Sequence, residues 1–151
     1  MSIVSLIKSC PLFYELYDNE IMSIVDSCRV INLKPGDKIF SEGDMGEEIY
    51  LILSGSAIVK KGDLSIAILR QGDLFGEMVL LKENIRHADI VSDNYTDVLV
   101  VSYHDIFGLY ETDKNAFSII MLNLARLLAG RLRKAGESIL ELKQESYKKA
   151  S

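Results

Sequence analysis

The 151-residue sequence has only two cysteines and two histidines, and it lacks an excess of positive charge. Cys10 and Cys28 have no partners at metal-ligand spacing, so we interpret them as reduced core thiols of a cytoplasmic protein. His87 and His104 lack a third ligand, and we expect no metal site. A net charge of −5 argues against a surface that binds nucleic acid by itself.

Long apolar runs and processing signals are also missing. No run reaches the roughly 18 residues that a membrane span needs, because polar residues such as Asn123 and Arg126 interrupt the longest runs. The N-terminal stretch MSIVSLIKSCPLF has no sustained apolar core and no small-residue cleavage site. We therefore expect a cytoplasmic protein that is neither secreted nor embedded in a membrane.

Signatures of catalysis are absent as well. No serine or cysteine stands in a nucleophile-elbow context, and no pair of carboxylates stands out for acid–base work. The acidic, glycine-rich segment EGDMGEE (42–48) lacks the ordered ligand positions of a calcium loop. The sequence therefore predicts a protein that is not an enzyme and has no catalytic residue and no cofactor.

The sequence does contain the composition of a globular domain, with 48% hydrophobic and 26% charged residues. Near the N-terminus, Asp18 is a predicted cap for a helix whose apolar residues fall on one face. Short β-rich runs separated by glycine turns then follow, at 29–33, 38–40, 48–54, 56–61, 64–70, 87–93 and 97–103. Strands this short with turns this regular favour a barrel or jelly-roll over a parallel α/β sheet.

The pattern becomes helical after Tyr103. Ser102 and Asp105 have the spacing of a capping box, and Thr112 or Asp113 can cap a second helix. Apolar residues then recur at three- and four-residue steps to position 142, but Gly130 and Gly136 predict a bend or break in this helix. The fold class is α+β. We expect one domain, 1–151, with a helical lead-in (1–29), a β-roll (30–103) and C-terminal helices (104–149).

The segment FGEMVLLKENIRHAD (75–89) places Glu77 and Arg86 in an apolar neighbourhood. Gly76 lets the backbone approach a ligand, and amides freed by such a turn can face an anion. Arg86 adds a permanent charge with a planar fork that matches phosphate oxygens. Glu77 can only accept hydrogen bonds, so its natural partner is a hydroxyl. These features fit a compact nucleotide, but a partly buried Glu77–Arg86 salt bridge closing a barrel end is an equally good reading of the pair.

The segment also resembles the phosphate-binding cassette of the cyclic-nucleotide-binding domain family. That family includes catabolite activator proteins, kinase regulatory subunits and cyclic-nucleotide-gated channels. Its pattern is Phe-Gly-Glu, several aliphatic or small residues, a short loop and then an arginine. The resemblance extends to CPLFYELYDNEI, LKPGDKIFSEGDMGEEIYLILSGSAIV, QGDLFGE and LNLARLLAGRLRKAG, and thus to nearly the whole chain. It implies a double-stranded β-helix jelly-roll.

The resemblance implies a role for each matched position. Glu77 accepts from the ribose 2′-hydroxyl, and Arg86 holds the cyclic phosphate. Further nucleotide-binding positions, some contributing backbone amides and others lining the pocket, are Gly76, Met78, Val79, His87, Ala88, Val59, Ile66 and Arg131. The chain departs from the family pattern at His87, where a small residue is usual, and at Ala135 and Gly136, where some members present hydroxyls to the purine.

We therefore expect a regulatory module that senses cAMP, with cGMP as the second candidate ligand, and that signals to an unknown effector by movement of its C-terminal helix. The alternative is a degenerate copy of this fold that serves as a dimerisation or protein-interaction module without ligand. A heptad-like seam on the last helix predicts a homodimer, and its residues are Leu128, Leu132, Ala135, Ile139 and Leu142. The alternative is that the stripe packs on the barrel of its own chain, which we favour for Leu128 and Leu132, whereas Ile139 and Leu142 lie too far along the helix and need a partner.

Overall fold

The computed structural model describes residues 2–150. Three short helical segments come first, namely α1 (Ile3–Lys8), the 3-10 helix η1 (Pro11–Phe13) and α2 (Asp18–Asp26). The predicted cap of α2 was wrong by one residue. Tyr17 is the N-cap, because the Glu20 carboxylate accepts a hydrogen bond from the Tyr17 N–H at 3.0 Å. Asp18 is instead the first helical residue and forms an ion pair with Lys8.

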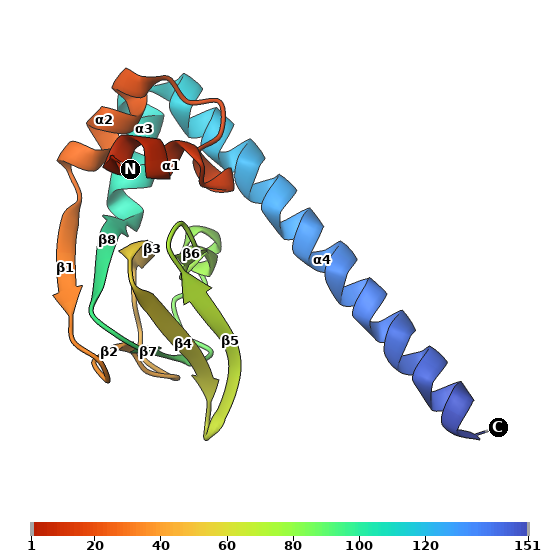
Figure 1. Cartoon of the computed structure of the whole chain (residues 1–151). Helices are drawn as coiled ribbons and strands as arrows, with labels where there is room; N and C mark the ends of the chain where they lie inside the picture. The colour runs from red at the N-terminus through yellow and green to blue at the C-terminus, as the bar shows by residue number, and fades with distance from the viewer. Residues whose placement is uncertain (1, 151) are drawn as a thin grey trace.

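The middle of the chain folds into two antiparallel four-stranded sheets (Figure 1). One has the order β1-β8-β3-β6 and the other β2-β7-β4-β5. Their strands are β1 (Arg29–Leu33), β2 (Lys38–Phe40), β3 (Glu48–Ser54), β4 (Ser56–Lys61), β5 (Leu64–Arg70), β6 (Leu74–Phe75), β7 (Asp89–Ser92) and β8 (Thr96–Ser102). This confirms the predicted jelly-roll, but the two sheets do not close into a barrel.

Every predicted β-rich run contains a strand, and the additional strand β6 is only two residues long. Leu74 and Phe75 pair with Leu51 and Tyr50 of β3. A two-residue strand has no alternation of its own, so only the tertiary pairing reveals it.

Two apolar clusters form the core. The larger one lies between the helices and the β1-β8-β3-β6 sheet, and the smaller one lies between the two sheets. Cys10 and Cys28 are free thiols in the larger cluster or against it, as predicted for core cysteines. Burial, followed by the nearby Asp105 carboxylate, raises the pKa of Cys28 to about 11, so this thiol stays protonated at neutral pH.

Helix α3 (Tyr103–Thr112) begins at the predicted capping box. The Ser102 hydroxyl accepts from the Asp105 N–H at 3.0 Å, and the Asp105 carboxylate accepts from the Ser102 N–H at 3.3 Å. Asp113 accepts from the Ala116 N–H at 3.1 Å and thereby caps α4 (Lys114–Ala150). Both caps that the sequence predicted at these helices are confirmed.

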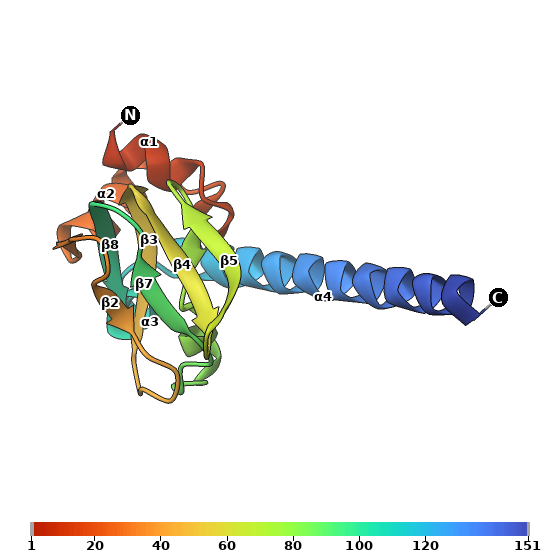
Figure 2. The same ribbon diagram turned by 60° about the horizontal axis from the view of Figure 1, so that its bottom comes forward.

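Helix α4 is continuous over 37 residues, so the predicted bend or break at Gly130 and Gly136 was wrong. Each glycine costs only about 1 kcal/mol relative to alanine in a helix, and strong helix formers surround both positions. Figures 1 and 2 show that the C-terminal half of α4 stands clear of the roll. Within residues 2–150, no helix is both long enough and apolar enough to cross a membrane.

The N-terminal half of α4 is fixed to the lead-in by Asn123, which is only 3% exposed. Its side-chain amide donates to the carbonyls of Leu12 at 3.1 Å and Tyr14 at 2.8 Å, and its oxygen accepts from Arg126 at 3.2 Å. This one side chain therefore joins segments more than 100 residues apart in the sequence.

Replacing Asn123 with alanine is expected to lower the free energy of unfolding by about 1–3 kcal/mol, because two carbonyls lose their donor. Denaturant unfolding measures the change. Asn115→Ala is the matched control, since Asn115 is an exposed asparagine of the same helix and its loss is expected to cost less than about 0.5 kcal/mol. Equal stabilities of the two variants would contradict the anchoring role of Asn123.

Candidate functional site

The candidate site begins where β6 ends at Gly76. This residue has φ +80°, and a Cβ at this position would lie 2.9 Å from Arg86 Nη1 and 3.1 Å from the Glu48 carbonyl oxygen. A glycine is therefore required both for the backbone conformation and for the close approach. The short 3-10 helix η2 (Glu77–Leu81) follows.

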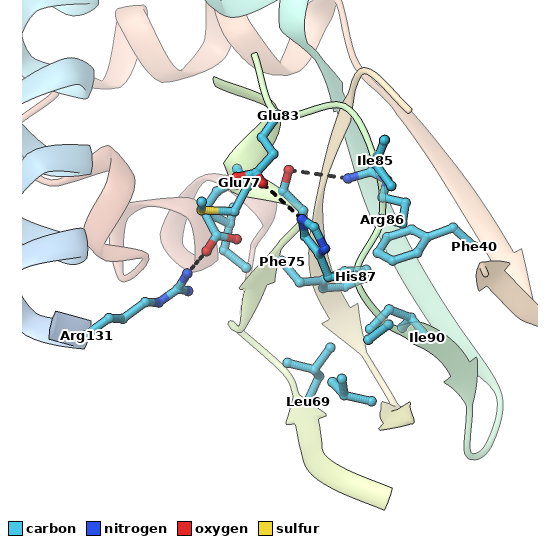
Figure 3. A pocket seen from close by; sticks show the side chains of 15 residues that line it. Phe40, Leu69, Phe75, Glu77, Glu83, Ile85, Arg86, His87, Ile90 and Arg131 are labelled. Atoms are coloured by element: carbon cyan, nitrogen blue, oxygen red, sulfur yellow. Dashed lines mark hydrogen bonds and ion pairs between the residues drawn. The ribbon is translucent and has the colours of Figure 1, made fainter. Parts of the chain in front are cut away.

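A cavity of about 360 Å³ opens between η2, the loop that leads to β7, the sheet β2-β7-β4-β5 and α4 (Figure 3). This volume lies within the range of roughly 300–1,000 Å³ that is typical of small-molecule sites. Eight of the ten predicted site residues line it, namely Val59, Gly76, Glu77, Met78, Arg86, His87, Ala88 and Arg131.

Val79 and Ile66 are the two predicted residues that do not line this cavity. The Val79 side chain is fully buried in the core beneath the helices. Ile66 lies at an irregularity of β5, where the pairing shifts between Val59 and Lys60, and its side chain is half exposed. The pairing partner of Val59 is Ala67, so the β5 residue that shares its face is not the predicted Ile66.

Seven lining residues were not predicted, namely Phe40, Leu69, Leu74, Phe75, Glu83, Ile85 and Ile90. Most are apolar residues on strands, and nothing in a strand sequence distinguishes a residue that faces a cavity from one that faces the core. Glu83 belongs to the loop between the two predicted charged residues. The position of Glu83 three residues before Arg86 was the one sequence signal that could have indicated that Glu83 lines the cavity.

Arg86 is a buried cation, with only 7% of its surface exposed. Nη2 donates to the Glu48 carbonyl at 2.8 Å and Nη1 to the Gly76 carbonyl at 3.4 Å, while Nε has no hydrogen-bond partner in the described part of the chain. The guanidinium carbon lies 4.3 Å from the centre of the Phe40 ring and 5.6 Å from that of Tyr50. Among residues 2–150, no carboxylate forms a salt bridge with Arg86.

Glu77 pairs with Arg131 of α4 and not with Arg86, so the salt-bridge reading of the Glu77–Arg86 pair is wrong. Glu77 is only 3% exposed, whereas about half of the Arg131 side chain is exposed. Burial lowers the pKa of the Arg131 guanidinium from its ordinary value, although an arginine remains charged at neutral pH. This ion pair connects η2 to the long helix at the edge of the cavity (Figure 3).

His87 and Glu83 are both exposed and both line the cavity. His87 Nε2 lies 3.1 Å from Glu83 Oε1, four residues earlier in the chain. The imidazole that replaces the small residue expected after Arg86 is thus held against a neighbouring carboxylate (Figure 3). Within the described range, no group of histidine, cysteine and carboxylate side chains is arranged to hold a metal ion.

Comparisons with known proteins identify relatives of this chain. A family model described as "Cyclic nucleotide-binding domain" matches residues 30–113. The chain is 34% identical over 148 residues to the cyclic AMP receptor protein of Thermus thermophilus, covering 95% of this chain and 65% of that protein. It is 38% identical over 85 residues to a cGMP-dependent protein kinase of Toxoplasma gondii, covering 56% of this chain and 9% of the kinase. The chain thus spans less than two thirds of the length of either relative.

The crystal structure of the Thermus thermophilus catabolite activator protein is similar in fold. It superimposes with a TM-score of 0.76 at 32% identity, covering 88% of this chain and 63% of that one. The family model matches more than half of the sequence, from the first strand of the roll to the start of the last helix. The chain belongs to the cyclic nucleotide-binding domain family.

Proposed function

We propose that this chain is a non-enzymatic regulatory module that binds a cyclic nucleotide, cAMP in the first place, in the cavity beside η2. The observation that carries this proposal is the buried Arg86 guanidinium, which has no carboxylate partner in the described residues and an unused Nε donor. A buried charge of this kind is costly unless an opposite charge joins it. The anion of a ligand would supply that charge.

The chemistry of the remaining lining fits the rest of a nucleotide. A cyclic phosphate has one negative charge, which matches the one lining guanidinium without a carboxylate partner in the described residues, that of Arg86, and its oxygens fit the planar fork of an arginine. Apolar side chains of the strands and of η2, among them Val59, Leu69 and Met78, lie where a sugar and a purine would be covered. The Glu77 carboxylate, an acceptor, would receive the hydrogen of a ribose hydroxyl.

Similarity supports cAMP over cGMP as the first candidate. The relative that matches 95% of this chain carries cyclic AMP in its name, whereas the relative named for cGMP matches only 56% of it. Family members that select cGMP often have threonine directly after the phosphate arginine, whereas this chain has His87. cGMP remains the second ligand to be tested.

The signal would leave the module through α4. A ribose hydroxyl that binds Glu77 must share this carboxylate with Arg131, so the ligand acts directly on an α4 contact. Suppose that α4 has one position with ligand and another without it. The ligand can then shift the equilibrium between these two positions only by the difference in its affinity for them.

The far half of α4 would bind a second copy of the chain. Leu132, Ile139 and Leu142 are 76%, 59% and 66% exposed, although they lie at heptad-like steps. The C-terminal half of α4, which contains Ile139 and Leu142, stands clear of the roll, so the chain's own sheets do not cover these two residues (Figure 2). A parallel pair of α4 helices would remove this seam from water.

The ion pair between Glu77 and Arg131 favours a second candidate function, a module that binds no ligand. Because Glu77 is already neutralised by Arg131, the fold could also serve as a dimerisation or protein-interaction module without ligand. Titration with cAMP and cGMP separates the two functions, since only the first predicts binding. The following predictions assume the first.

Replacing Arg86 with alanine is expected to weaken cAMP binding by well over tenfold, because loss of one partner of a desolvated charge pair costs roughly 2–5 kcal/mol. Arg86→Lys should recover only part of this loss, since an ammonium lacks the planar fork. Calorimetry with cAMP and cGMP measures both effects and should rank cAMP as the tighter ligand. Equal affinities of wild type and Arg86→Ala would reject Arg86 as the phosphate contact.

The Glu77→Ala substitution is expected to weaken cAMP binding less than Arg86→Ala does, because a single hydroxyl contact is lost. The sharper test uses 2′-deoxy-cAMP. Wild type should bind this analogue more weakly than cAMP, whereas the Glu77→Ala variant should bind the two about equally. A variant that still discriminates between them would show that the hydroxyl has another partner.

The double substitution Ile139→Asp/Leu142→Asp is expected to give a monomer, because two charges at the seam oppose burial. Light scattering measures the mass, and calorimetry should show little change in cAMP affinity. A matched control is Glu141→Ala/Glu145→Ala, which alters exposed charges of the same helix and should leave the dimer intact. A wild type that is monomeric at high protein concentration would refute the dimer.

A further inference from the structure

Phe40 is an aromatic residue of the cavity wall that contacts the buried cation of the site. Its half-buried ring lies at the end of β2, 46 residues before Arg86 in the sequence. The Arg86 guanidinium carbon is 4.3 Å from the centre of this ring, well within the roughly 6 Å that defines a cation–π contact. Figure 3 shows the two side chains together on one side of the cavity.

The backbone of Arg86 is fixed by the acidic loop EGDMGEE (42–48). Arg86 N–H donates to the Asp44 carbonyl at 2.8 Å, and the Arg86 carbonyl accepts from the Gly43 N–H at 2.8 Å. A Cβ at Gly46 would lie 2.5 Å from Nη2 and 2.7 Å from Nε, so this loop also passes directly beside the guanidinium. The loop contacts Arg86 through its backbone and leaves the carboxylates of the loop out of the site.

A ring and a carboxylate stabilise a buried guanidinium in different ways. A carboxylate binds the N–H edge and occupies the donors that a phosphate needs. An aromatic ring attracts the positive charge through the face of the guanidinium and occupies no N–H donor. The contact with Phe40 therefore compensates the charge without using an N–H donor, and Nε has no hydrogen-bond partner in the described chain.

We propose that Phe40 is a positioning residue of the site: its ring takes the place of a counter-ion for Arg86 and orients the guanidinium so that its free donors face an anionic ligand. This inference rests on the proposed function, because the anion is taken to be the cyclic phosphate. It adds a residue from a distant strand that belongs to neither the cassette nor α4.

The test compares Phe40→Leu, which keeps apolar volume but removes the ring, with Phe40→Tyr, which keeps the ring. We expect Phe40→Leu to weaken cAMP binding by about tenfold, the range of a desolvated cation–π contact. Phe40→Tyr should recover most of this affinity. Thermal unfolding of each variant shows whether the fold is retained.

A double-substitution cycle separates positioning from packing. In an Arg86→Gln background, which has no cation, Phe40→Leu should cause no further loss of cAMP affinity. Phe75→Leu is the matched control, because Phe75 belongs to the same aromatic cluster but makes no cation–π contact with Arg86 in the described chain. Any loss that it causes should be the same with Arg86 or Gln at position 86. Independent effects of Phe40→Leu and Arg86→Gln would overturn the proposal.

A measurement without ligand distinguishes failure of this inference from failure of the proposed function. The magnetic field of the Phe40 ring should shift the NMR signal of the Arg86 side-chain N–H, and this shift should disappear in Phe40→Leu but persist in Phe75→Leu. A signal that Phe40→Leu leaves unchanged overturns the positioning role. If the signal moves but wild type binds neither cAMP nor cGMP, the orientation of Arg86 by Phe40 stands and the cyclic nucleotide as its ligand is rejected.

Discussion

A guanidinium that is buried beside a cavity has to be compensated, because its transfer out of water is unfavourable by several kcal/mol. In this protein the compensation for Arg86 comes from two backbone carbonyls and two aromatic rings, and not from an acidic side chain. Those groups come from Phe40 of β2, from Glu48 and Tyr50 of β3, and from Gly76 after β6. The packing of these strands around the cavity therefore stabilises the positive charge of Arg86.

The same arrangement leaves the acid of the cassette free to contact the long helix. Glu77 pairs with Arg131 and not with Arg86, and this contact connects the cavity to α4. Eight residues earlier in α4, Asn123 fixes the helix to the lead-in through the carbonyls of Leu12 and Tyr14. Between these two contacts, one at the core and one at the cavity, α4 is held in place, and beyond them it projects from the roll (Figure 1).

The continuity of α4 follows from the weakness of glycine as a helix breaker. Gly130 and Gly136 lie among leucine, arginine, lysine and alanine residues, and hydrogen bonds along the helix backbone do not depend on a side chain. Under the proposed function, a change at the Arg131 contact would be transmitted to the region of Ile139 along this uninterrupted helix.

The sequence by itself determined the local features of this protein. The short alternating runs predicted the strands, the Ser102–Asp105 spacing and Asp113 predicted helix caps, and the cassette pattern predicted that Glu77 and Arg86 lie at one cavity. These features depend on neighbours in the chain, on turn glycines and on hydrogen bonds that span three residues, all of which are visible in a linear pattern.

The tertiary structure alone decided which distant residues meet. Glu77 forms its ion pair with Arg131 and not with Arg86. The Phe40 ring of β2 contacts the Arg86 guanidinium. Val79 is buried in the core, whereas Leu69 lines the cavity. The irregular pairing of β5 likewise leaves Ile66 away from the cavity. Such choices depend on the register of strands and the packing of one layer on another, which involve residues tens of positions apart, so no local pattern of residue types contains them.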